Sequence, residues 1–226
     1  MKLLGFSRKQ MNEVEIIIFD ADGTIFDSMP FVAKIFADVL ARYIIPRKES
    51  KDYMYATAGT PTAEQFNTIL KKHHKPTDKV KSLVKEFNDL MEGHIPNIFA
   101  DVIPTFKKLK NFKNIVSTNL RQDILNARIK HHGLHKYLDR YLGTNGFKSK
   151  EEHFDEIKRI YHLSDKDFSK KVILVGDGKT DMEFARKYKI LGIGKVGIEN
   201  AKTLKKTGAL HTINNLSEVV KILKNE

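Results

Sequence analysis

The sequence predicts an α/β protein in which a parallel β-sheet, covered by helices, carries an inserted helical domain. Short apolar runs recur without polar alternation, as expected for strands that are buried on both faces of a parallel sheet. Segments with helical periodicity separate these runs from residue 114 onward. The interval between the first two runs is much longer than the ~30 residues of a complete strand–helix–strand unit.

The predicted strands are short runs rich in isoleucine and valine. The first covers residues 14–19, and the others cover 115–116, 141–142, 172–175, 190–193 and 212–213. Apolar residues spaced by three or four positions predict helices between the strands. These stripes are Ile124, Leu125 and Ile129, then Phe154, Ile157, Ile160 and Tyr161, and finally Leu216, Val219, Val220 and Leu223.

The long interval between the first two strands predicts a second domain. It covers the 86 residues 28–113, of which a helix at about 101–110 is enough for the crossover. The remainder has the apolar stripes of helices over 31–40 and 80–91, and a turn at 59–62 that starts another helix. We therefore predict two domains, a core of residues 1–27 and 97–226 and a helical cap of residues 28–96.

The composition excludes several kinds of site and segment. The chain has no cysteine, which excludes disulfides, thiolate metal sites and cysteine nucleophiles. No apolar run approaches the ~20 residues of a membrane-spanning helix, and the segment before Arg8 is too short for the apolar core of a secretory signal. We therefore predict a cytoplasmic protein with no membrane partner, with Met11 as a second candidate for the first residue.

The chain is strongly basic, with 40 Lys and Arg residues, 28 Asp and Glu residues and a net charge of +12. The excess lies in residues 100–226, which hold 26 of the basic and 15 of the acidic residues. These lysines are scattered over predicted helices, and no basic stretch alternates with aromatic residues as in proteins that bind single strands. We interpret the excess as a solvated surface and expect no nucleic-acid partner.

A first acidic turn, Asp20-Ala21-Asp22-Gly23-Thr24, follows the first predicted strand. Two carboxylates beside a buried strand repel each other and lose hydration unless a cation or a proton relieves them. Mg²⁺ would do so because it prefers oxygen ligands, and Gly23 permits a sharp turn. An EF-hand calcium loop is excluded, since its sixth and twelfth positions would be Ile25 and Phe31 instead of glycine and glutamate.

A second acidic turn, Gly176-Asp177-Gly178-Lys179-Thr180-Asp181, follows the predicted strand 172–175. Asp181 comes four residues after Asp177, one turn into a helix that begins near Gly178, so both carboxylates can face one site. Because parallel strands end at the same edge of a sheet, this turn and the first one can share a cation.

These two turns resemble the motifs of the haloacid dehalogenase (HAD) superfamily of magnesium-dependent phosphohydrolases. The run Asp22-Gly23-Thr24-Ile25-Phe26-Asp27-Ser28 is similar to the phosphoglycolate phosphatase and β-phosphoglucomutase branch, which carries a helical cap between its first and second motifs. The resemblance covers nearly the whole chain from about residue 14. It implies a Rossmann-like HAD core with a helical cap, Mg²⁺ as the cofactor, and a small phosphorylated metabolite as the substrate.

The resemblance also implies a role for each acid. Asp20 would be the nucleophile that forms an aspartyl-phosphate, and a carboxylate needs no activating base for this attack. Asp22 would protonate the leaving oxygen and then deprotonate the hydrolytic water, while its backbone carbonyl binds the metal. Asp177 would ligate the metal and Asp181 would support or join its ligands, so the metal site would comprise Asp20, Asp22, Asp177 and Asp181.

Three further residues are implied as ligands of the phosphoryl group. The family's second motif is a Ser or Thr after an apolar strand. Ser117, Thr118 and Asn119 follow the predicted strand 115–116, and Thr118, followed by Asn119, matches this motif better than Ser117 does. The family's lysine is Lys148 or Lys150, because the frequent Lys-Pro signature is absent. We prefer Lys150, which lies at the start of a predicted helix with acids in its first turn.

The predicted activity is magnesium-dependent hydrolysis of a small phosphate monoester, and the substrate and the oligomeric state stay open. One alternative is a phosphomutase that uses the same Asp20 and Asp22 pair. Phosphonate and haloacid hydrolases of the superfamily fit less well, because they lack the second aspartate found here as Asp22. The other alternative is a non-catalytic protein that binds a phosphorylated ligand or a nucleic acid, although all the catalytic positions are filled.

Overall fold

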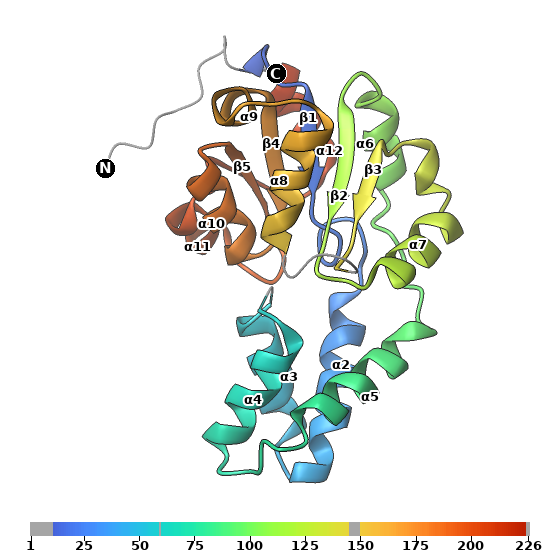
Figure 1. Cartoon of the computed structure of the whole chain (residues 1–226), viewed down its shortest axis with the longest axis vertical. Helices are drawn as coiled ribbons and strands as arrows, with labels where there is room; N and C mark the ends of the chain where they lie inside the picture. The colour runs from blue at the N-terminus through green and yellow to red at the C-terminus, as the bar shows by residue number, and fades with distance from the viewer. Residues whose placement is uncertain (1–10, 59, 145–149, 225–226) are drawn as a thin grey trace. The chain divides into compact units, whose positions relative to one another are not determined.

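The computed structural model describes residues 11–58, 60–144 and 150–224 of the chain (Figure 1). Two compact units share the chain, one made of Met1–Phe26 with Ile98–Glu226 and the other of Asp27–Asn97. The first unit is an α/β domain and the second contains helices. Within the described ranges, no helix is both long and apolar enough to cross a membrane.

The strands of the first unit form one parallel sheet in the order β3-β2-β1-β4-β5-β6, which confirms the predicted α/β class. Phe19, the last residue of β1, pairs with Val116 of β2 and Val175 of β4. The residues that follow these strands therefore lie at one edge of the sheet. The bounds are β1 Ile16–Phe19, β2 Lys113–Ser117, β3 Arg140–Leu142, β4 Val172–Gly176, β5 Leu191–Lys195 and β6 His211–Ile213, and each overlaps a predicted strand.

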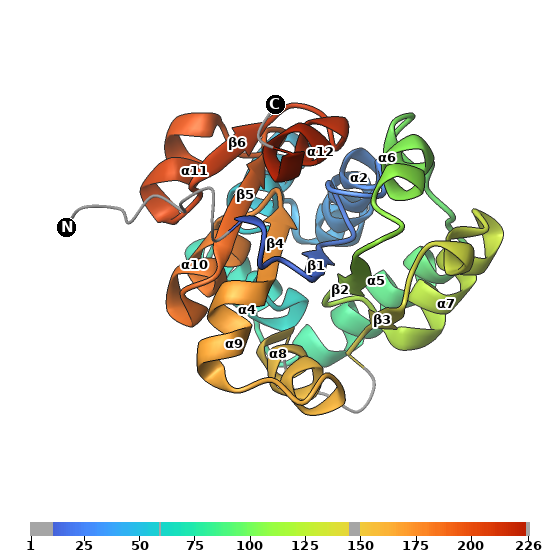
Figure 2. The same ribbon diagram turned by 90° about the horizontal axis from the view of Figure 1, so that it is seen from above.

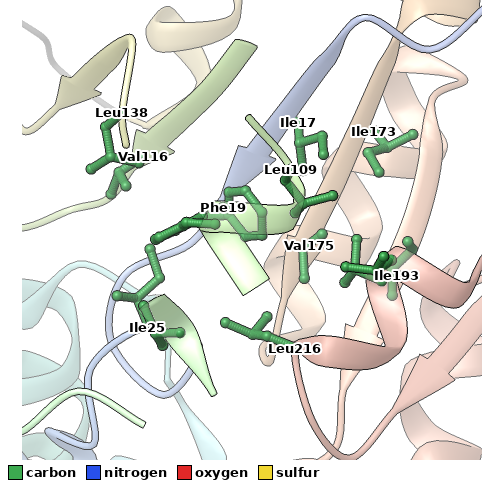
Figure 3. Packing of buried hydrophobic residues seen from close by; sticks show 14 of the residues in the cluster. Ile17, Phe19, Ile25, Leu109, Val116, Leu138, Ile173, Val175, Ile193 and Leu216 are labelled. Atoms are coloured by element: carbon green, nitrogen blue, oxygen red, sulfur yellow. The ribbon is translucent and has the colours of Figure 1, made fainter. Parts of the chain in front are cut away.

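Helices cover both faces of this sheet (Figure 2). They are α6 Val102–Lys108, α7 Gln122–His131, α8 Lys150–Ile160, α9 Asp165–Lys171, α10 Lys179–Tyr188, α11 Ala201–Thr207 and α12 Ser217–Lys224, with the 3₁₀ turn Leu134–Lys136. Ile17 and Phe19 of β1 pack in one buried cluster with residues of α6, α7 and α12. Figure 3 shows part of this cluster, including Val175 of β4. Ile16 and Ile18 pack in a second cluster with α8, α9 and α10. Because both faces of β1 are buried, its sequence is continuously apolar.

Two helices of the first unit carry no apolar stripe in the sequence. The seven-residue helix α9 has Phe168 as its buried residue, and α11 has Leu204. A helix with a single buried position has no periodicity to detect. Their caps are visible instead, since Ser164 accepts a hydrogen bond from Asp167 N–H and Asn200 accepts one from Thr203 N–H.

The second unit packs its helices around aromatic rings. The rings of Phe36 and Phe66 are stacked with centroids 4.6 Å apart, and Phe87 meets Phe66 edge-on at 6.0 Å. The helices are α2 Met29–Leu40, α3 Arg47–Ala56, α4 Thr62–Lys72 and α5 Val80–Glu92, with the 3₁₀ turn Ala41–Tyr43. No apolar stripe predicts α3, which buries only Ser50 and Met54. Gly59, at the start of the predicted turn, lies outside the described residues.

Candidate active site

Three aspartates meet at the edge of the sheet where β1 and β4 end. Asp20 follows β1, Asp177 follows β4, and Asp181 lies in the first turn of α10. Each offers a carboxylate oxygen, and these oxygens lie within 4.8 Å of one another. The backbone N–H of Asp20 donates to the Val175 carbonyl at 2.8 Å, which continues the β1–β4 pairing into the site. The structure therefore brings together three of the four predicted acids.

Glycines make room for this cluster. A Cβ atom at Gly23, where φ is +81°, would lie 2.0 Å from Oδ2 of Asp177. A Cβ atom at Gly176 would lie 2.4 Å from Oδ2 of Asp181. Since no larger residue fits without moving a carboxylate, both glycines are needed for the close approach of the two acidic turns.

Lys150 joins two of the three acids. Its Nζ atom donates to Oδ1 of Asp20 and to Oδ1 of Asp181, both at 2.6 Å, and its side chain is 5% exposed. Burial on its own lowers the pKa of this amine, but the carboxylates of Asp181 and Asp20 outweigh burial and raise it. Lys150 is thus a fixed positive charge beside Asp20. Lys148, the alternative lysine, lies outside the described residues.

The single positive charge of Lys150 does not neutralise the three carboxylates of this cluster. Burial raises the pKa of Asp20 to about 7; Lys150 opposes this rise, while the charges of Asp181 and Asp22 add to it. Burial also raises the pKa of Asp177, and the charges of Asp20 and Asp181 add to this rise. Burial and mutual repulsion therefore favour protonation of Asp20 and Asp177 unless another cation offsets their charge. Carboxylate oxygens at this spacing fit a hard divalent cation such as Mg²⁺, which Asp20, Asp177 and Asp181 would hold.

This electrostatic imbalance predicts opposite effects of pH and Mg²⁺ on stability. Between about pH 4 and pH 7, folded Asp20 keeps a proton that the unfolded chain loses, so its contribution to the free energy of unfolding falls as pH rises. Mg²⁺ competes with these protons, so it should stabilise the protein more at pH 8 than at pH 5. At pH 8, Mg²⁺ at 100-fold excess over its Kd should raise the free energy of unfolding by about 2.7 kcal/mol. Thermal unfolding with Mg²⁺ or with chelator measures this.

The variant Asp177→Asn distinguishes Mg²⁺ binding at this cluster from the titration of other groups in the protein. The variant should lose most of the Mg²⁺-dependent shift, whereas Asp155→Asn, whose side chain is 66% exposed on α8, should keep it. A shift of equal size in both variants, or one independent of pH, would contradict a shared cation site.

Asp22 lies in the same turn, but its carboxylate has a different partner. Its Oδ1 atom accepts a hydrogen bond from Nη1 of Arg128 at 2.9 Å, and its side chain is 20% exposed. The carboxylate cluster does not include Asp22. The family resemblance implies that Asp22 binds the metal through its backbone carbonyl, so its carboxylate need not lie in the cluster.

Thr118 and Asn119 follow β2 at the same edge of the sheet as Asp20. The hydroxyl of Thr118 accepts a hydrogen bond from Leu120 N–H at 3.2 Å, and its backbone N–H donates to Leu142 O. Thr118 is buried and Asn119 is exposed. The neighbouring hydroxyl of Ser117 is turned inward and contacts His153.

His153 is a buried residue of α8 that the sequence analysis did not identify. Its Nε2 atom lies 3.0 Å from the Gly143 carbonyl and therefore carries the proton, so Nδ1 accepts from the Ser117 hydroxyl at 2.9 Å. Burial lowers the pKa of this imidazole to about 4. Neutral His153 thus ties the ends of β2 and β3 to the helix that carries Lys150.

Two buried cations near the site were also missed. Arg128 stands among the apolar residues of α7, and Lys195 is the last residue of β5. Lys195 Nζ donates to the Gly23 carbonyl at 2.9 Å. The sequence does carry a signal for Lys195. This lysine ends an apolar strand, and Asp20 and Asp177 likewise stand at the ends of apolar strands. For Arg128 the signal is a charge next to buried Leu125 and Ile129.

Comparisons of sequence agree with this geometry. A family model described as haloacid dehalogenase-like hydrolase matches residues 17–194. Phosphoglycolate phosphatase of Vibrio vulnificus is 24% identical over 180 residues, which cover 75% of this chain and 78% of that protein. The phosphoglycolate phosphatase of Vibrio cholerae is 24% identical over 183 residues, which cover 76% and 80% of the two proteins.

Solved structures have the same fold. A haloacid dehalogenase-like family protein from Streptococcus pneumoniae superposes with a TM-score of 0.80 at 18% identity, covering 93% of this chain and 99% of that chain. A HAD family hydrolase from Deinococcus radiodurans, solved with bound phosphate and sodium, has a TM-score of 0.70 at 16% identity and coverages of 94% and 96%. The family match over most of the chain confirms the predicted resemblance, and the protein belongs to the haloacid dehalogenase-like hydrolases.

Proposed function

We propose that this hydrolase is a magnesium-dependent phosphatase that cleaves a small phosphate monoester through an aspartyl-phosphate on Asp20. The observation that carries the proposal is the placement of Asp20 at the end of β1, bonded to Lys150 and within reach of Asp177 and Asp181. A nucleophilic carboxylate with a fixed cation beside it suits attack on a phosphoryl group, because the negative charges of both partners must be offset.

The proposed reaction has two steps that balance in protons. In the first, a carboxylate oxygen of Asp20 bonds to phosphorus, the ester P–O bond breaks, and Asp22 gives its proton to the leaving oxygen. In the second, water attacks phosphorus, Asp22 takes the proton of that water, and the bond between phosphorus and Asp20 breaks. Inorganic phosphate and an alcohol leave, and both aspartates regain their starting states.

The bound cation and the phosphate ligands offset charge during these steps. Mg²⁺, when bound, would keep the carboxylates ionised and neutralise phosphoryl oxygens. We assign phosphoryl contacts to Lys150, to the Thr118 hydroxyl and to the Asn119 amide. Thr118 suits this role better than Ser117, whose hydroxyl is engaged by His153.

We propose a small phosphorylated metabolite as the substrate and the helical unit Asp27–Asn97 as the domain that selects it. The named activity of the two Vibrio relatives makes phosphoglycolate the first ester to test. The phosphate bound to the Deinococcus radiodurans relative supports a phosphorylated ligand for the same fold. A location in the cytoplasm stays a prediction from the sequence.

Phosphate release from a panel of esters tests this function. The panel contains phosphoglycolate, sugar phosphates and nucleoside monophosphates, each with Mg²⁺ and with chelator. We expect release that requires Mg²⁺, with one class of ester clearly preferred. Isomerised sugar phosphate in place of free phosphate would indicate a mutase, and neither product from a folded protein that binds Mg²⁺ would contradict the proposal.

A further inference from the structure

The turn that carries Asp22 is compact and closed by backbone hydrogen bonds. The N–H groups of Ile25 and Phe26 both donate to the Ala21 carbonyl at 2.9 Å, and Gly23 N–H donates to the Phe26 carbonyl at 2.8 Å. These bonds fix the backbone of the turn but do not set the torsion angles of the Asp22 side chain. Its direction must therefore come from side-chain partners.

Arg128 supplies such a partner from α7. Its side chain is fully buried, Nη1 donates to Asp22 Oδ1 at 2.9 Å, and the guanidinium carbon lies 5.7 Å from the centroid of the Phe26 ring. Its Nε and Nη2 atoms have no hydrogen-bond partner in the described part of the chain. A buried guanidinium with unpaired N–H groups is unfavourable for stability. Stability therefore does not explain this arginine.

Lys195 fixes the next residue of the turn from the other side of β1. In the order of the sheet, β2 and the following α7 lie on one side of β1, whereas β5 lies on the other side, beyond β4. Lys195 is 5% exposed, its Nζ atom donates to the Gly23 carbonyl at 2.9 Å, and it lies 3.6 Å from the centroid of the Phe99 ring. The two cations thus hold adjacent residues of one turn.

We infer that Arg128 is a positioning residue that sets the direction of the Asp22 carboxylate, while Lys195 anchors the neighbouring backbone. This inference rests on the proposed role of Asp22 in proton transfer. Because Arg128 is buried and acts through Asp22, its loss should lower kcat and leave KM nearly unchanged. A residue that held substrate would change KM.

A double-mutant cycle tests whether Arg128 acts through Asp22 alone. We expect Arg128→Met to lower kcat about 10- to 100-fold. This loss is smaller than the roughly 10²- to 10⁴-fold that a general acid contributes, because Asp22 itself is still present. In the Asp22→Asn background the same change should alter kcat by less than about 2-fold. Arg128→Lys should restore part of the rate. Multiplicative losses in the double variant, or a rise in KM equal to the fall in kcat, would overturn the inference.

A crystal structure of Arg128→Met tests the position of Asp22 without any need for activity. We expect the Asp22 carboxylate to turn away from its place in the wild-type protein, and an unchanged carboxylate would overturn the inference. Lys130→Met, an exposed change on the same helix, is the matched control for both measurements. Arg128→Gln, which also removes the positive charge, takes the place of the methionine variant if that variant does not fold. Absence of phosphate release by the wild-type protein would contradict the proposed function. The crystal structure would still show whether Arg128 sets the position of the Asp22 carboxylate.

Discussion

Replacing Asp20 by asparagine is expected to lower phosphate release by about 10³-fold or more, since removal of a covalent nucleophile leaves only residual catalysis. Asparagine has nearly the same shape as aspartate, so the Lys150 side chain keeps a hydrogen-bond acceptor at this place. The measurement is kcat on the best ester of the panel at saturating Mg²⁺. Acid-quenched wild-type protein should also carry covalent phosphate, and the variant should carry none.

This loss should not come from unfolding. Because burial raises the pKa of Asp20 to about 7, its ionised form is unfavourable in the metal-free protein at higher pH. The metal-free variant should therefore be at least as stable as the wild-type protein at pH 8. Asp155→Asn is the control for a change of charge on the surface. Turnover by Asp20→Asn within about 10-fold of the wild type would mean that another group attacks phosphorus.

Replacing Lys150 by methionine is expected to affect both stability and turnover. The substitution keeps an apolar stem of similar length but leaves Asp20 and Asp181 without the ammonium group that lies 2.6 Å from each. Removing one member of a buried ion pair costs about 3–5 kcal/mol when the other charge cannot escape. Here the carboxylates can take up protons, so the loss in free energy of unfolding should be smaller at pH 5 than at pH 8. Denaturant unfolding at both pH values measures it.

Lys158→Met is the matched control for this variant. Lys158 lies on the same helix, its side chain is 21% exposed, and it pairs with Asp155 and Asp165 at the surface. Its loss should cost less than about 1 kcal/mol. Turnover should fall about 10²- to 10³-fold in Lys150→Met and stay near the wild-type value in Lys158→Met. Equal effects of the two substitutions would contradict a special place for Lys150 beside the nucleophile.

Much of the fold could be predicted because its strands are buried on both faces. Such a strand is continuously apolar, so the run that contains β1 stands out from its surroundings, as does the run that contains β4. The helices α9 and α11 could not be predicted from apolar spacing, since each buries one residue. Helix α3 has the same weakness, because its buried face consists of Ser50 and Met54.

The sequence by itself determined where the acids stand along the chain. Asp20, Asp177 and Asp181 could be placed at one edge of the sheet, because parallel strands end together and the spacing of Asp177 and Asp181 is one helical turn. The two glycines that let the acidic turns approach each other are also local features of the same motifs. Local pattern and strand direction are enough for such a prediction.

Only the tertiary structure decided which partner each acid has. The contact of Asp22 with Arg128 joins residues 106 positions apart, and that of Lys150 with Asp20 joins residues 130 apart. No local pattern encodes such distances. The sequence offers Lys150 at a helix start and Arg128 beside two apolar residues of its helix, but the local pattern does not say which carboxylate each of them contacts. These contacts arise on folding, when packing removes water from the charges and makes them depend on opposite charges nearby.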